Sequence, residues 1–204
     1  MLFTVATLSP RLGRARYRME AIMIRKAWLT VLILGMGPLA LAGGLDEFES
    51  DGRYRYQGQS PDFTVDYPWQ WQDSAEVRPP LVMQAAHRDQ LPVLRVAVLD
   101  EPFWLPLAFA TRAASTQLSA LGRDIEVVSE DVVELDSGVR ANVGEVTWTA
   151  DVGIGVSVRS LYVHGFHDGH WVVVNLTTAD LGRPVPEAMR AIAMSLAFPE
   201  RPES

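Results

Sequence analysis

Cysteine is absent from the 204 residues, so the chain forms no disulfide and has no thiolate to serve as a nucleophile or a metal ligand. Lysine occurs once, at Lys26, and histidine only four times. No serine lies in a Gly-x-Ser-x-Gly motif, the strained turn that presents the nucleophile of many hydrolases. These absences remove several common catalytic classes and leave stability dependent on the burial of apolar side chains.

Long hydrophobic runs are also missing, with one partial exception at residues 27–42. This run is shorter than the ~20 residues that a spanning helix needs, and two glycines and a proline interrupt it. Two basic residues precede the run, and Ala40-Leu41-Ala42 ends it with a small-x-small pattern. We therefore predict a cleaved signal peptide, export to the periplasm or the medium, and no membrane anchor after cleavage.

This signal divides the chain into unequal parts. Residues 1–22 fit poorly with it and are interpreted as a misassigned start or an extended basic segment ahead of the signal. The predicted organisation is residues 23–42 as signal peptide, 43–60 as a flexible polar tether with a short strand at Tyr54–Gln57, 61–199 as one domain, and 200–204 as a tail.

Charge is unevenly distributed between these parts. The whole chain has a net charge of −7, but residues 43–204 carry 12 basic and 24 acidic side chains, a net charge of −12. Nucleic acid and anionic lipid would be repelled by such a surface. We expect a monomer whose partners are neutral or cationic, with no nucleic-acid ligand.

Hydrophobic periodicity predicts strands separated by two helices. The expected fold class is α+β: an antiparallel β-sheet of about six to seven strands, built from hairpins and a meander, with two helices packed on it. Strands are predicted at residues 63–67, 81–87, 93–99, 125–135, 139–150, 156–166 and 171–177, and helices at residues 106–121 and 186–196.

The first predicted helix has apolar residues at steps of three and four, Pro106 at its start and Gly122 as its C-terminal cap. Ser115 is expected to face solvent. Farther along, Asp168-Gly169 has the composition of a two-residue hairpin turn, which would place Phe166 opposite Trp171. Both faces of that hairpin are then apolar, so we expect cover on both sides of the sheet.

The order of these elements resembles the PsbP-like fold, which includes bacterial envelope proteins of the DcrB type. The resemblance covers residues 61–198. It depends on Phe63-Thr64-Val65-Asp66-Tyr67-Pro68 followed by Trp69 or Trp71, on the helix at 106–121, on the meander at 125–177 and on the closing segment 192–198. It implies an exported, non-catalytic binding or accessory protein that engages an envelope protein or a small ligand, without cofactor or catalytic residues.

The alternative is a metal-binding protein or metal-dependent hydrolase that uses the segment from His164 to His170. Strand alternation opposes this alternative because it sends His164 to the opposite face from His167 and His170. We therefore assign no metal ligand and interpret the cluster as polar residues on a solvated turn.

Other polar and aromatic residues yield no catalytic or binding assignment. The aromatic residues at 69, 71, 103 and 104 are interpreted as core packing, with an exposed binding patch as the alternative. Glu130 and Asp131 are interpreted as surface charge, as are Asp100 and Glu101. The glycosylation sequon at Asn175 lies in a predicted strand and is treated as chance.

Overall fold

The computed structural model describes residues 52–74, 77–87, 90–99, 106–151 and 155–199. The predicted signal peptide, the first half of the tether (residues 43–51) and the tail lie outside these residues. The elements in chain order are β1 (Arg53–Gln59), β2 (Asp62–Pro68), β3 (Gln72–Asp73), β4 (Leu81–His87), β5 (Gln90–Leu99), η1 (Leu107–Phe109), α2 (Ala110–Leu118), β6 (Gly122–Glu134), β7 (Arg140–Ala150), β8 (Val156–His167), β9 (His170–Ala179) and α3 (Glu187–Met194).

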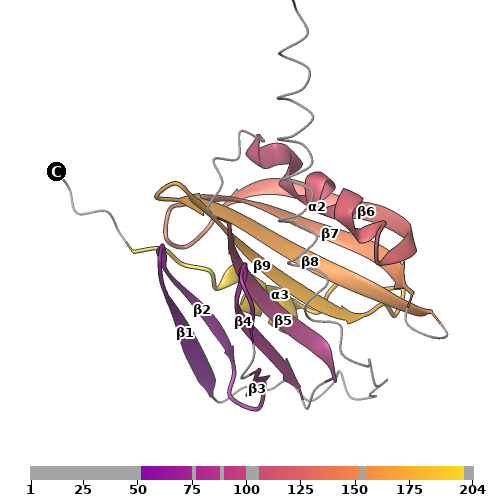
Figure 1. Cartoon of the computed structure of the whole chain (residues 1–204), viewed down its shortest axis with the longest axis horizontal. Coiled ribbons are helices and arrows are strands. Elements are labelled where there is room, and N and C mark those ends of the chain that lie inside the picture. The colour runs from indigo at the N-terminus through magenta and orange to yellow at the C-terminus, as the bar shows by residue number, and fades with distance from the viewer. Residues whose placement is uncertain (1–51, 75–76, 88–89, 100–105, 152–154, 200–204) are drawn as a thin grey trace, which may run out of the picture.

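Seven of the strands form one antiparallel sheet in the order β3-β4-β5-β9-β8-β7-β6, and β1 and β2 form a separate hairpin (Figure 1). Strands β6 to β9 are consecutive neighbours, as expected of a meander. The fold prediction is therefore confirmed: the protein is α+β, with an antiparallel sheet and two helices on it.

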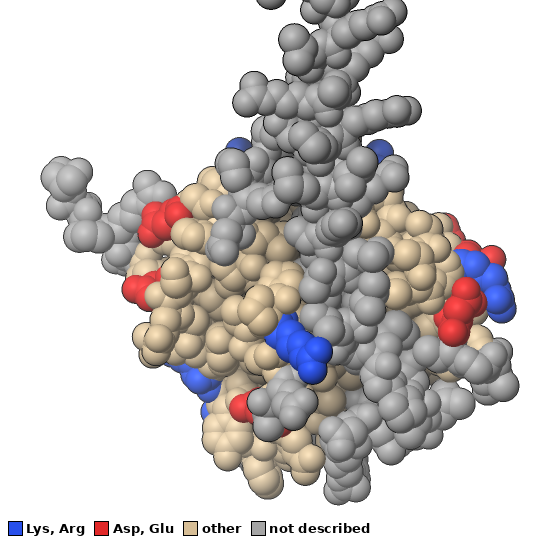
Figure 2. All heavy atoms as spheres, viewed as in Figure 1, with Lys and Arg blue, Asp and Glu red and all other residues tan. Residues whose placement is uncertain are grey.

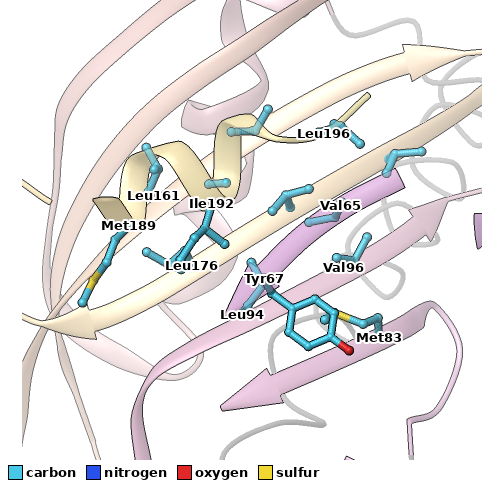
Figure 3. Close-up of a cluster of buried hydrophobic side chains, with 14 of the residues drawn as sticks. Val65, Tyr67, Met83, Leu94, Val96, Leu161, Leu176, Met189, Ile192 and Leu196 are labelled. Atoms are coloured by element: carbon cyan, nitrogen blue, oxygen red, sulfur yellow. The ribbon is translucent and has the colours of Figure 1, made fainter. Parts of the chain in front are cut away.

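The sheet is covered on both faces, as the apolar hairpin β8–β9 predicted. On one face α3 and the β1–β2 hairpin enclose a core that includes Val65, Leu94, Leu161 and Met189 (Figure 3). On the other face α2 buries Ala110, Ala114 and Leu118 against a second core. A sheet whose strands are apolar on both sides requires both covers to exclude water.

The turn at Asp168-Gly169 has the predicted geometry. Both residues have positive φ, at 47° and 83°, as a tight hairpin turn requires. Phe166 pairs with Trp171 and His167 pairs with His170. The register of the central hairpin was therefore readable from the turn residues and the alternation alone.

Two predictions about the first helix are wrong: its C-terminal cap and the exposure of Ser115. Helix α2 ends at Leu118, and Gly122 begins β6 instead of capping the helix. A Cβ at Gly122 would meet the side chain of Trp148 at 2.8 Å and the backbone of Thr149 still closer, so glycine allows β6 to begin against β7. Ser115 is buried and donates a hydrogen bond to the carbonyl of Arg112 at 2.8 Å instead of facing solvent.

Residues 53–59 belong to the fold, although the sequence assigned them to the tether with only a short strand. They form β1, which pairs with β2 along its whole length from Arg53 opposite Pro68 to Gln59 opposite Asp62. The side chain of Tyr56 packs against the core and donates a hydrogen bond to the carbonyl of Val82 at 3.1 Å. Five of the seven residues of β1 are exposed, so its sequence did not predict this contact.

Candidate functional site

His164 and His167 lie on opposite faces of the sheet. His164 is fully buried on the α2 side of the sheet, where its ring stacks on Tyr162 with centroids 5.6 Å apart. His167 packs on Phe198, which belongs to the core on the opposite face, with centroids 4.8 Å apart. Among the described residues, no three His, Asp or Glu side chains are arranged to hold a metal ion.

The opposite placement of His164 and His167 agrees with the prediction from strand alternation. The interpretation as a solvated turn is wrong for these two side chains, because both are buried, whereas the side chain of Asp168 in the turn is 62% exposed. Burial lowers the pKa of His164 to about 3, and a hydrogen bond to the backbone of Asn142 only partly opposes this effect. His164 is consequently a neutral core residue at physiological pH.

A row of polar residues crosses the same face of the sheet. Arg95, Asn175 and Tyr162 lie directly opposite one another on β5, β9 and β8. Arg95 donates a hydrogen bond to Gln84 at 3.1 Å, and burial lowers its pKa to about 10, so it stays charged at neutral pH. Burial raises the pKa of Tyr162 and keeps the phenol neutral.

Next to this row, the side chains of Trp148, Ser160, Thr177 and Asn175 are joined by successive hydrogen bonds. Trp148 donates to the hydroxyl of Ser160 at 3.1 Å, Ser160 and Thr177 lie 3.0 Å apart, and Thr177 donates to Asn175 at 3.1 Å. Ser160 is therefore engaged by a tryptophan and a threonine, and the arrangement has the form of a structural network, not of a serine nucleophile with its base.

The other face holds a buried ionic network. Arg159 donates to Glu145 at 3.1 Å and to Asp180 at 3.3 Å, and Arg190 of α3 donates to Glu145 at 2.6 Å. Both side chains of the Arg159–Glu145 pair are at most 10% exposed. The network joins β7, β8 and α3, and each charge in it has an opposite partner, as buried ions require.

Glu130 was predicted to be a surface charge, but the structure buries its side chain. Its side chain is only 6% exposed and forms an ion pair with Arg112 at 3.3 Å. Asn142 donates to the same carboxylate at 3.3 Å and accepts a hydrogen bond from the hydroxyl of Thr111 at 2.6 Å. These bonds attach the first turn of α2 to β6 and β7.

The aromatic residues divide between core and surface. Trp71 is buried as predicted, whereas Trp69 is 54% exposed and Tyr54, on the neighbouring strand, is 55% exposed. The indole of Trp69 lies over Gly52, where a Cβ would come within 2.6 Å of it. Residues 100, 101, 103 and 104 lie outside the described residues.

The described surface includes one open groove at the end of the β1–β2 hairpin, with a volume of about 220 Å³. It is lined by Gln57, Asp62, Phe63, Thr64, Ala197, Phe198 and Pro199. Thr64 and Ala197 exchange backbone hydrogen bonds of 2.8 and 3.0 Å beneath it. The groove contains a single carboxylate and no titratable base, so it has no acid–base pair.

Charges on the face shown in Figure 2 form small separate groups of both signs and no continuous basic field. Within the described residues, none of the helices has the length and apolar character needed to cross a bilayer. Asn175 of the sequon is buried in β9, which agrees with its interpretation as a chance match.

A helix on one face of this antiparallel sheet, with a helix and a β-hairpin on the other, defines the PsbP-like α+β fold. Cyanobacterial PsbP (CyanoP) from Synechocystis sp. PCC 6803 has a similar structure, with a TM-score of 0.51 and 19% identity over 79% of this chain and 99% of that one. The Saccharomyces cerevisiae Ran-binding protein Mog1p is also similar, with a TM-score of 0.50 and 12% identity over 72% of this chain and 95% of that one.

No protein-family model and no curated protein matches the sequence. At these identities the structural likeness establishes the fold and assigns no residue roles.

Sequence reasoning missed the buried charged residues, although a signal for two of them exists. Arg95 and Arg159 each lie within a largely apolar strand, and a charge in that position must be paired or hydrogen-bonded if the strand is buried. The acidic partners Glu145 and Asp180 carried no such signal, because they are brought to Arg159 only by the pairing of β7, β8 and β9.

Proposed function

We propose that the mature chain is an exported, non-catalytic binding or accessory protein of the bacterial envelope, and that its ligand is another protein. Export is supported by the basic-apolar-small pattern of residues 23–42. The Ran-binding Mog1p, described as a protein that binds a protein, has the same fold and supports this kind of role.

One observation carries the proposal: in the described part of the chain, two groups of buried polar side chains bind one another. The Trp148–Asn175 chain and the Glu145 network are internally bonded. The described groove of about 220 Å³ is smaller than the roughly 300–1,000 Å³ of small-molecule sites. A protein partner at the surface fits these features better than a small ligand in a pocket.

Two exposed aromatic side chains at one end of the β1–β2 hairpin could contact a protein partner. Tyr54 and Trp69 are each more than half exposed, and they lie at the same end of the β1–β2 hairpin. Large aromatic side chains are enriched in protein interfaces because they bury much area with little loss of rotamer entropy.

The proposal is tested by purifying the protein natively from the envelope and analysing it by intact-mass and cross-linking mass spectrometry. The expected result is a mature chain that starts at Gly43 and reproducibly co-purifies with one envelope protein. A matched preparation of the Trp69→Ala variant tests whether the aromatic pair contributes. Recovery without any reproducible partner, or a turnover that a purified sample catalyses, would refute the proposed role.

A further inference from the structure

β6 is the last strand of the seven-stranded sheet, and of the described strands it pairs only with β7 (Figure 1). One of its edges therefore presents backbone N–H and C=O groups that no described strand takes up. The strand is 13 residues long, whereas strands are commonly about 5–6 residues long. A long unpaired edge is a template on which another strand can be added.

Acidic side chains dominate this strand. It contains a single basic residue, Arg123, which already lies 3.5 Å from Asp124 and 3.0 Å from Asp151. The carboxylate of Glu130 is bound by Arg112. The acidic residues of β6 are Asp124, Glu126, Glu130, Asp131 and Glu134.

Glu126 and Asp131 are two of the three acidic residues of β6 that remain available, and the third, Glu134, lies opposite Arg140 in the β6–β7 ladder. Glu126 and Asp131 are both exposed, and neither forms an ion pair with a described residue. They lie on the same face of the sheet, because their β7 partners are Thr147 and Val143, and Val143 belongs to the core beneath α3. Both carboxylates would therefore lie on the same face of the sheet as alternate side chains of an added strand.

The negative charge of the β6 edge determines which kinds of ligand could bind there. Two copies paired through β6 would bring acidic strands together, and like charges opposite one another destabilise a strand pair. Nucleic acid and anionic lipid are repelled by the same carboxylates. An extended segment with Lys or Arg at alternate positions would place its cations on one face, beside Glu126 and Asp131.

We propose that the free edge of β6 binds an extended basic segment of the partner protein by β-strand addition. This inference rests on the proposed function, because it specifies the chemistry of the protein partner. Main-chain hydrogen bonds supply the contact, and the carboxylates of Glu126 and Asp131 select basic side chains.

Val128 contributes to the selectivity. It lies at the irregularity where the β6–β7 register shifts between Val127 and Ser129, and it is 47% exposed. A bulge with flanking acidic residues discourages pairing with an uncharged strand or with a second β6. The exposed valine still offers an apolar contact to a segment whose charges are complementary.

The test uses synthetic decapeptides and the purified mature protein. One peptide alternates Lys and Thr, a second has the same composition with all lysines in one block, and a third alternates Glu and Thr. Binding is measured by isothermal titration calorimetry, and amide hydrogen exchange of β6 is followed by mass spectrometry. We expect the alternating Lys peptide to bind most tightly and to slow exchange specifically in β6.

The double variant Glu126→Gln with Asp131→Asn should weaken this binding roughly tenfold, because it removes both cross-strand ion pairs. The matched control, Asp62→Asn with Glu187→Gln, removes two exposed carboxylates from β2 and α3 and should bind like the parent protein. Three results would overturn the proposal. The control variant could lose as much affinity as the double variant, the blocked Lys peptide could bind as tightly as the alternating one, or peptide binding could leave amide exchange in β6 unchanged.

Partner capture with the same variants separates this inference from the proposed function. If the Glu126→Gln, Asp131→Asn protein retains the envelope partner of the parent protein, strand addition at β6 is refuted and the binding role stands. If the parent protein captures no partner, the binding role itself fails, whatever the peptides do.

Discussion

His164 shows how burial fixes the chemistry of one side chain. Its imidazole stacks on Tyr162 and is buried, and burial lowers its folded-state pKa to about 3 from an ordinary value of 6.5. Between these two pH values the unfolded chain binds a proton at His164 that the folded protein does not bind. The free energy of unfolding therefore decreases as pH falls through this window and is fully retained above it.

We predict that His164→Gln reduces the pH dependence of the unfolding free energy between pH 6.5 and 3. The reduction should be at most about 1.4 kcal/mol per pH unit, the value for one proton. Urea titrations at several pH values measure it, and His87→Gln, which removes a half-buried imidazole on β4, is the reference variant. Identical pH slopes for His164→Gln and the parent protein would contradict a neutral buried imidazole.

At the same scale, Glu145 is the shared acceptor of two arginines. Glutamine at this position would direct an amide N–H₂ group or an uncharged oxygen at Arg159 and Arg190 and leave buried positive charge poorly compensated. We predict that Glu145→Gln lowers the free energy of unfolding by roughly 3 kcal/mol.

Chemical denaturation measures this loss, and Arg123→Gln is its matched control. The Arg123 side chain is 64% exposed, so its ion pairs should contribute less than about 1 kcal/mol. A Glu145→Gln protein as stable as the control would show that the network does not hold α3 on the sheet.

At the scale of elements, the short helix α2 depends on a close approach to β7. A Cβ at Gly144 would lie 2.7 Å from the Cβ of Thr111, which is nearer than packed side chains come. Thr111 is also the residue whose hydroxyl donates to Asn142. Glycine at position 144 therefore allows the helix to be both packed and hydrogen-bonded there.

We predict that Gly144→Val forces α2 away from the sheet and costs about 1–3 kcal/mol of stability, or roughly 2–12 °C in melting temperature. The control is Gly138→Asn: position 138 has a φ of 74° and open space around it, and asparagine tolerates that conformation. Thermal unfolding followed by circular dichroism compares the two. Equal melting temperatures would mean that α2 tolerates a longer separation from β7.

At the scale of the whole molecule, location depends on residues 23–42. We predict that the chain, expressed with its own leader in a bacterial host, is recovered from the periplasm or the medium with Gly43 as its first residue. N-terminal sequencing and intact mass measure this. Replacing Ala40 and Ala42 with leucine should block processing, because the cleavage pattern requires small residues. Unprocessed parent protein in the cytosol would refute export.

Sequence alone determined the elements that obey simple periodicities. The alternation in β8 and β9 and the turn at Asp168-Gly169 fixed the register of the central hairpin, since positive φ is tolerated by few residues. Two-sided apolar strands likewise required cover on both faces of the sheet, and α2 and α3 provide it. These inferences succeed because each depends on neighbours within a few residues.

Only the tertiary structure determined which residues pair with the buried charges and which strand lies at the edge of the sheet. Arg159 meets Asp180, 21 residues away, and Arg190 meets Glu145, 45 residues away, only because β7, β8, β9 and α3 come together. Strand β5 pairs with β9 and not with β6, its successor among the strands. The β4–β5 hairpin therefore lies at the opposite end of the sheet from β6, and β6 is an edge strand. Local patterns contain no information about such distant pairings, and these pairings decide which carboxylates are buried and which remain free to bind.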